Sequence, residues 1–108
     1  MDRTAVVHEY YRCLDEGDYE TLRSHLSDSF TQYRPDRTFE SPVAFVAFMR
    51  DDRPMTDTTH QLADVLANDL GVAAHGTLIG ADGTDVFAFI DVFRFDDAGA
   101  IDAIETYS

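Results

Sequence analysis

One carboxylate in this sequence stands where an apolar side chain is expected. The segment from Val86 to Phe93 reads VFAFIDVF, and strand alternation puts Asp91 on the same face as Phe87, Phe89 and Phe93. A carboxylate among aromatic rings must either bind polar partners or keep its proton with a raised pKa. Both states suit proton transfer, which makes Asp91 the first candidate for a catalytic residue. The alternative is a structural aspartate bonded to a tyrosine or a backbone amide, or one at the open rim of the sheet.

Two histidines precede Asp91 on segments that are expected to form neighbouring strands. His60 and His75 could each accept a proton near neutral pH if they face a pocket. A three-residue-type connection between Ala81 and Thr84 would place His75 opposite Asp91, whereas a two-residue turn would place it on the other face. The sequence leaves this register open, and a lone histidine on a strand is more often a surface residue.

The sequence carries no recognised cofactor or metal motif. It contains no His-Glu-x-x-His spacing, no glycine-rich phosphate loop and no serine nucleophile elbow. The single cysteine, Cys13, excludes an internal disulfide, and its position one turn after Tyr10 favours a small core residue over a nucleophile. We therefore expect neither a cofactor nor a metal.

The charge balance is the most unusual feature of the composition. The 108 residues include 21 Asp and Glu against 8 basic residues, all of them arginine, which gives a net charge of -13. Such a surface repels nucleic acid and anionic lipid, and concentrated salt relieves its self-repulsion. No apolar run reaches the roughly 20 residues of a membrane helix, and the first residues do not form a signal peptide. We expect a cytoplasmic protein of a halophile that binds neither nucleic acid nor membranes.

The first part of the chain has helical periodicity and the second part has strand patterning. Apolar spacing and capping residues predict helices at residues 3–16, 18–26 and 43–49. Strands are predicted at residues 30–33, 58–67, 72–80, 85–95 and 100–107, and turn sequences separate the last four. Helices followed by an antiparallel meander predict one α+β domain over residues 1–108.

The segment around Asp91 is apolar on both faces of its strand. The face opposite Asp91 carries Val86, Ala88, Ile90 and Val92. Because helices cover only one face of such a sheet, we expect the other face to meet a second copy of the chain. The sequence therefore predicts a homodimer formed through the sheet.

Two segments resemble a known family. Residues 90–101, IDVFRFDDAGAI, are similar to the penultimate strand, turn and final strand of ketosteroid isomerases and SnoaL-like polyketide cyclases, within the nuclear-transport-factor-two-like superfamily. Tyr10 and residues 14–20, LDEGDYE, are similar to the helix-one tyrosine and the Gly-Asp elbow of these proteins. With the lysine-free, acidic composition, the chain resembles a haloarchaeal member of the SnoaL-like family.

The resemblance implies a curved antiparallel sheet wrapped around three helices, which encloses a cone-shaped, mainly apolar pocket in the cystatin-like arrangement. In ketosteroid isomerases the positions matched by Tyr10 and Asp91 form an oxyanion hole with a protonated carboxylic acid. In the cyclases the matching aspartate donates or accepts a proton. The isomerase base falls at Arg34, which stays charged and cannot abstract a proton. Steroid isomerisation by the usual route is therefore not expected, and residues 104–106 also lack the His-Trp-Asp ending of many relatives.

We therefore predict a cofactor-free acid–base isomerase, cyclase or hydrolase acting on a small apolar molecule. Asp91 is the expected proton donor or acceptor, with Tyr10 as its hydrogen-bonding partner. The expected substrate-binding residues are Phe87, Phe89, Phe93, Phe45, Met49, Arg34 and His75. The leading alternative is a non-catalytic ligand-binding or dimerisation module on the same fold. Epoxide hydrolysis by an Asp-Arg-Asp arrangement ranks third, because no second inward aspartate is identifiable.

Overall fold

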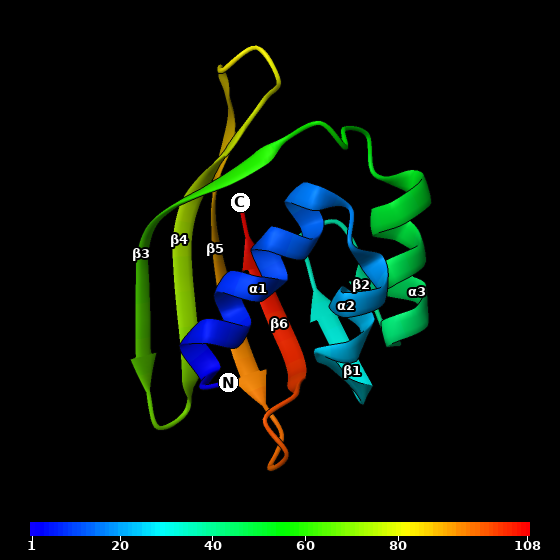
Figure 1. Ribbon diagram of the computed structural model, residues 1–108, viewed down its shortest axis with the longest axis vertical. Helices are drawn as coiled ribbons and strands as arrows, with labels where there is room; N and C mark the ends of the chain where they lie inside the picture. The colour runs from blue at the N-terminus through cyan, green and yellow to red at the C-terminus, as the bar shows by residue number, and fades with distance from the viewer.

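The computed structural model describes residues 1–108 and packs three helices on one face of a six-stranded sheet (Figure 1). Helix α1 (Arg3–Glu16) begins at Asp2, whose side chain accepts a hydrogen bond from the backbone N–H of Ala5. It ends at Gly17, whose φ of 71° is in the left-handed region that favours glycine. None of the helices has both the length and the apolar character needed to cross a membrane.

The next two helices are short. Helix α2 (Tyr19–Ser24) ends earlier than predicted, because Leu26 pairs with Ile101 in the sheet and the N–H of Ile101 donates to the His25 carbonyl. The prediction that Leu26 lies in this helix is therefore wrong. Helix α3 (Pro42–Ala47) begins at the Ser41 cap as predicted and continues into a π-helical turn, η1 (Phe48–Asp52).

The sheet is curved and unclosed, with strand order β2-β1-β6-β5-β4-β3. The last four strands form the predicted antiparallel meander. β1 lies parallel to β6, which the sequence analysis did not predict. The strand bounds are β1 (Leu26–Tyr33), β2 (Thr38–Phe39), β3 (Thr59–Asn68), β4 (Gly71–Ile79), β5 (Asp85–Phe95) and β6 (Ile101–Tyr107).

A β-bulge in β3 determines which of its side chains face the helices. The register with β4 shifts between Leu62 and Asp64, so His60 stays on the inner face while Asp64 lies on the outer face. Gly76 makes this close pairing sterically feasible, because a Cβ there would lie 2.4 Å from the Gln61 carbonyl oxygen. The bulge therefore puts His60 and Asp64, which belong to the same strand, on opposite faces of the sheet.

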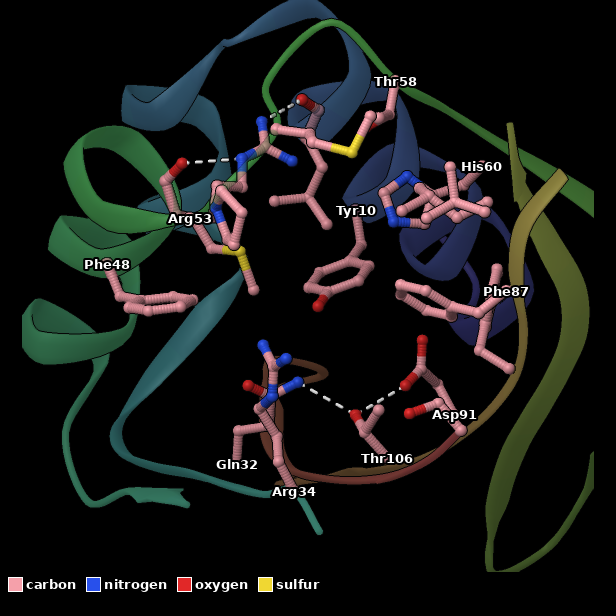
Figure 2. A pocket seen from close by; sticks show the side chains of 18 residues that line it. Tyr10, Gln32, Arg34, Phe48, Arg53, Thr58, His60, Phe87, Asp91 and Thr106 are labelled. Atoms are coloured by element: carbon pink, nitrogen blue, oxygen red, sulfur yellow. Dashed lines mark hydrogen bonds between the residues drawn. The ribbon is translucent and has the colours of Figure 1, made fainter. Parts of the chain in front are cut away.

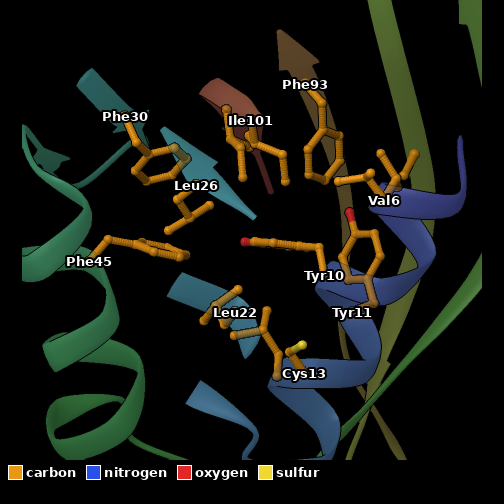
Figure 3. Close-up of a cluster of buried hydrophobic side chains, with 14 of the residues drawn as sticks. Val6, Tyr10, Tyr11, Cys13, Leu22, Leu26, Phe30, Phe45, Phe93 and Ile101 are labelled. Carbon is orange, nitrogen blue, oxygen red and sulfur yellow. The ribbon is translucent and has the colours of Figure 1, made fainter. Parts of the chain in front are cut away.

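The core lies between α1, α3 and the inner face of the sheet (Figure 3). Tyr10 of α1 stacks with Phe45 of α3, at 6.3 Å between ring centroids, and meets Phe93 of β5 edge-on at 5.2 Å. Cys13 is also fully buried, and burial raises the pKa of its thiol to about 11. Burial of each such aromatic side chain contributes roughly 1.5–3 kcal/mol, so this cluster fixes α1 against β5.

Candidate active site

A cavity of about 290 Å³ opens between α1, the η1 turn and the inner face of the sheet (Figure 2). This volume is close to the lower limit of typical small-molecule sites. Most of its wall is apolar, with Phe48, Met49, Phe87 and Phe89 among the lining residues. The polar side chains that reach it come from at least five different segments of the chain, and they include Tyr10, Arg34, His60, Asp91 and Thr106.

Asp91 is buried at the cavity wall, with 6% of its surface exposed. Its two oxygens accept hydrogen bonds from different elements: Tyr11 of α1 donates to Oδ2 at 2.5 Å and Thr106 of β6 donates to Oδ1 at 2.6 Å. Thr106 lies directly opposite Asp91 in the β5–β6 register. The carboxyl group is thus held between a helix and the neighbouring strand.

The environment of Asp91 favours its protonated form. Burial raises the pKa of Asp91 above its ordinary value, and the hydrogen bonds from Thr106 and Tyr11 oppose this effect without cancelling it. The nearby charges of His60 and Arg34 also act to lower the pKa. Asp91 is therefore a carboxyl group whose proton is retained to a higher pH than in a solvated aspartate.

The tyrosine that bonds Asp91 is Tyr11, and the prediction that Tyr10 is this partner is wrong. Adjacent residues of a helix project about 100° apart, so the two rings reach different neighbours. Tyr11 follows the buried Val7 by one turn, so it belongs to the apolar face of α1, and its ring packs against Phe89 and Phe93 of β5; this spacing is the sequence signal that could have identified it. Tyr10 instead points its hydroxyl into the cavity, where it makes no hydrogen bond within the protein (Figure 2).

His60 lines the cavity and is fixed by a carboxylate that the sequence analysis did not single out. Asp15, near the end of α1, accepts from the backbone N–H of His60 and lies 2.6 Å from ring nitrogen Nδ1. The side chains of His60 and Asp15 are only 14% and 20% exposed, respectively. An ionised Asp15 can only accept, so Nδ1 carries the proton and Nε2 is the basic nitrogen. This arrangement fixes both the tautomer and the ring position.

His75 does not reach the cavity, so its expected role in binding a substrate there is a wrong prediction. The register pairs Asp91 with Ala74 and His75 with Ile90, which places His75 on the outer face. Its nearest acidic partner is Asp64, at 3.8 Å, and both side chains are exposed. The register shift between Leu78 and Ile79 sets this alignment, and the turn sequence alone did not determine it.

The predicted apolar walls divide into two groups. Phe87, Phe89 and Met49 line the cavity. Phe45 and Phe93 are fully buried in the core beside Tyr10 and do not line it. The predicted face alternation of β5 is right from Phe87 to Phe93, and this face is long enough for one end to pack in the core and the other to line the cavity. It is wrong at Val86, which was predicted on the opposite face and lines the cavity beside the register shift between β4 and β5.

Two arginines line the cavity in different ways. Arg53 donates to the carbonyl oxygens of Met49 and Leu14 and to the Tyr19 hydroxyl, so it joins η1 to the helices. Arg34 follows β1, and its side chain makes no hydrogen bond within the protein. Its Nε is buried without a hydrogen-bond partner, 3.4 Å from an Asp36 oxygen in a poorly aligned ion pair. Its guanidinium lies 5.6 Å from the centre of the Phe48 ring. Arg34 lines the cavity as predicted.

The sequence analysis did not identify two further polar residues of the site. Gln32 is almost fully buried and donates from Nε2 to Thr106, while its Oε1 has no partner. Thr58 is also buried at the cavity wall. No group of three or more His, Cys, Asp or Glu side chains converges as a metal site would require. The site thus combines a neutral-favouring acid, an oriented imidazole, a free phenol and a guanidinium around an apolar space.

Comparison with known proteins places the chain in a family. Residues 7–104 match the model of the SnoaL-like domain, and the chain belongs to this family. No curated protein matches it. Similar solved structures include a candidate polyketide cyclase from Sinorhizobium meliloti, with 13% identity, a TM-score of 0.82 and coverage of 95% of this chain and 94% of that one.

Two other similar structures are named for different activities. A candidate ketosteroid isomerase from Kribbella flavida has 14% identity and a TM-score of 0.83, over 96% of this chain and 75% of that one. An epoxide hydrolase of the LEH-like type from M. tuberculosis has 19% identity and a TM-score of 0.81, over 97% and 80%. At these identities the likeness establishes the α+β fold and leaves the reaction open.

Proposed function

We propose that this SnoaL-like protein is a cofactor-independent acid–base enzyme that transfers a proton on a small, mainly apolar molecule. The observation that carries the proposal is that a buried, proton-retaining carboxyl group and an oriented imidazole line the same apolar cavity. Perturbed titratable groups of this kind concentrate at catalytic sites. The similar structures reported above are named as a candidate cyclase, a candidate isomerase and an epoxide hydrolase, and acid–base groups of this kind are compatible with such reactions.

The proposed roles follow from the protonation states. With a β,γ-unsaturated ketone, Asp91 donates its proton to the carbonyl oxygen while Nε2 of His60 removes a proton from the α-carbon, which gives a dienol. Return of the proton from His60 to the γ-carbon, and of the dienol O–H proton to Asp91, gives the conjugated ketone and completes an isomerisation. Arg34 stands where the isomerase base was expected and cannot serve as one, so His60 supplies the base.

The test measures proton exchange on a probe ketone. The protein in deuterium oxide should exchange the acidic C–H protons of β-tetralone, followed by proton NMR, at a rate that Asp91→Asn lowers by at least about 100-fold. Asp85→Asn is the matched control, because Asp85 is an exposed aspartate at the start of the same strand. A rate that is the same in Asp91→Asn and the native protein would contradict the catalytic role of Asp91.

A non-catalytic ligand-binding module is the second candidate, and one observation favours it. Both oxygens of Asp91 already accept hydrogen bonds from protein groups, and Nδ1 of His60 is engaged with Asp15. Such pairing is also what a purely structural role requires. Binding of β-tetralone without any exchange above the buffer rate would support this module over the enzyme.

Epoxide hydrolysis is less well supported. It needs a second carboxylate beside the Asp91 and Arg34 pair to hold a water molecule, and Asp91 is the only acidic side chain among the cavity-lining residues. Hydrolysis of limonene oxide by the native protein would reverse this ranking.

We also propose that the outer face of the sheet joins two copies of the chain. Ile90 and Tyr107 lie side by side there, 44% and 55% exposed, and no helix covers them. His75 and Asp64 continue the same row, and a two-fold axis can bring His75 of one copy against Asp64 of the other. Light scattering should give a dimer for the native protein and a monomer for Ile90→Asp; a native monomer would contradict the proposal.

A halophilic, cytoplasmic setting remains a proposal based on charge. With a net charge of -13, the folded chain should gain stability as salt screens its self-repulsion. The melting temperature should rise steadily between dilute buffer and multimolar potassium chloride. A melting temperature independent of salt would contradict this adaptation.

A further inference from the structure

One end of the cavity holds two hydrogen-bond donors that the protein leaves without acceptors. The Arg34 guanidinium makes no hydrogen bond within the protein, and neither does the Tyr10 hydroxyl. Figure 2 shows both groups directed at the same part of the cavity, near Asp91. Burial raises the pKa of Tyr10 well above its ordinary value, and the charge of Arg34 opposes this rise, as expected for two groups that lie close together. The ion pair of Arg34 with Asp36 involves its Nε, at 3.4 Å, so the terminal nitrogens and the Tyr10 hydroxyl are two convergent donors that match an anionic ligand group.

The position of Arg34 is built by its neighbours. Its guanidinium stacks near Phe48 and its Nε side is buried against the protein, so the terminal nitrogens are the part that remains open to the cavity. Arg53 provides a comparison, because its hydrogen bonds to Met49, Leu14 and Tyr19 occupy it structurally. Only Arg34 of these two is therefore free to bind a ligand through a planar pair of N–H groups.

The charges around the cavity favour the same type of ligand. Arg34 and Arg53 are permanently charged, and the only acidic side chain in the lining is Asp91, whose burial favours the neutral form. In a chain with a net charge of -13, a locally positive cavity is an exception to the average surface. An apolar space with a positive end selects a molecule that is apolar along most of its length and anionic at one end.

We infer that the substrate is a small, mainly apolar carboxylic acid whose carboxylate is bound by Arg34 and the Tyr10 hydroxyl. Arg34 holds the carboxylate through its two terminal nitrogens, and Tyr10 donates a third hydrogen bond. The apolar remainder then lies against Phe48, Phe87 and Phe89, beside Asp91. This inference rests on the proposed function only in taking the same cavity as the substrate site.

The test compares acids with their neutral amides of the same shape. Two pairs serve as probes: naphthoate with naphthamide, and cyclohexanecarboxylate with cyclohexanecarboxamide, measured by titration calorimetry at equal ionic strength. The native protein should bind the acid of each pair at least about tenfold more tightly, since hydrogen bonds to charged groups contribute this much or more. Arg34→Gln should remove the preference, and Tyr10→Phe should reduce it by a few-fold.

The matched control is Arg37→Gln. Arg37 is three residues away and carries the same charge, but it stacks on Phe39 and Phe48 and does not line the cavity. Its loss should leave the preference unchanged, which separates a local contact from the effect of net charge. Arg34→Lys keeps the charge without the planar pair of N–H groups and should retain part of the preference for the acid. It replaces Arg34→Gln as the test variant if Arg34→Gln does not fold.

The outcomes separate this inference from the proposed function. Equal binding of acid and amide to the native protein, or a preference that survives in Arg34→Gln, would overturn the carboxylate site and leave the acid–base proposal standing. A preference that depends on Arg34, together with no proton exchange on any probe, would support the carboxylate site and contradict the enzyme. Binding of neither member of either pair to the folded protein would also overturn the carboxylate site, while the exchange of β-tetralone would still decide the acid–base proposal.

Discussion

The two faces of the sheet each carry an aspartate–histidine pair, and the pairs differ in almost every physical respect. On the inner face, Asp15 and His60 lie 2.6 Å apart with little exposure, and Asp15 also binds the His60 backbone. On the outer face, Asp64 and His75 lie 3.8 Å apart, and their side chains are 65% and 53% exposed. The same two residue types thus form a fixed unit on one face and a loose surface contact on the other.

This difference shows why residue type alone does not identify a functional group. An exposed pair at 3.8 Å is screened by solvent and contributes at most about 1 kcal/mol. A largely buried pair with additional hydrogen bonds orients an imidazole and determines which nitrogen is basic. The position of each histidine relative to the β3 bulge and the β4–β5 register determines which case applies.

The sharpest test of the comparison exchanges each histidine for glutamine. His60→Gln should lower the rate of proton exchange on β-tetralone by about 100-fold or more, because it removes the base from the cavity. His75→Gln should leave the rate within about twofold, since His75 lies on the outer face. Equal losses from the two variants would break the comparison and point to a general effect on folding.

The aspartates should differ in their contribution to stability. Asp15→Asn should lower the free energy of unfolding by about 1–2 kcal/mol, because a charged acceptor of several hydrogen bonds becomes a neutral one. Asp64→Asn should change it by less than about 0.5 kcal/mol, as for other exposed residues. Urea denaturation of both variants measures this, and a larger effect for Asp64 would contradict the assignment of the faces.

Replacing Asp91 should have the opposite pair of effects to replacing Asp15. Asp91→Asn should lower activity strongly and raise stability slightly. Its folded-state pKa is raised by burial, so the native protein loses stability as the pH rises from about 3.9, the value of an unfolded aspartate, through the folded value. Asp91→Asn stays neutral, so its stability relative to the native protein should increase over this pH range, by on the order of 1 kcal/mol.

The control for this measurement is again Asp85→Asn, whose stability relative to the native protein should show no comparable rise with pH. Denaturation midpoints between pH 3.5 and pH 8, with ionic strength held constant, give the comparison. If Asp91→Asn became relatively less stable as the pH rises, Asp91 would be a stabilising carboxylate rather than a proton donor.

Much of the inner face could be predicted from the sequence. The alternation around Asp91 correctly placed it on the face with Phe89. The aromatic surroundings left polar partners or a raised pKa open for Asp91, and the structure combines the two. The helix caps at Asp2 and Ser41 and the meander of the last four strands are also confirmed. These features depend on local periodicity and capping chemistry, which neighbouring residues determine.

The pairings within the site could not be predicted in the same way. Tyr11 rather than Tyr10 bonds Asp91 because the rotation of α1 on the sheet is set by packing along the whole helix. Asp15 meets His60, 45 residues later, only because α1 ends over the start of β3. Both contacts join segments whose separation in sequence gives no local signal.

The sequence by itself determined the alternation of β5 from Phe87 to Phe93, the order of helices and strands apart from the unpredicted strand β2, and the acidic character of the chain, because these follow from residue types and their spacing. Only the tertiary structure determined that His60 faces the cavity and His75 does not, that Phe45 and Phe93 belong to the core, and that Arg34 remains without a hydrogen-bond partner. The physical reason is that bulges and strand register move a side chain from one face to the other through a shift of a single residue.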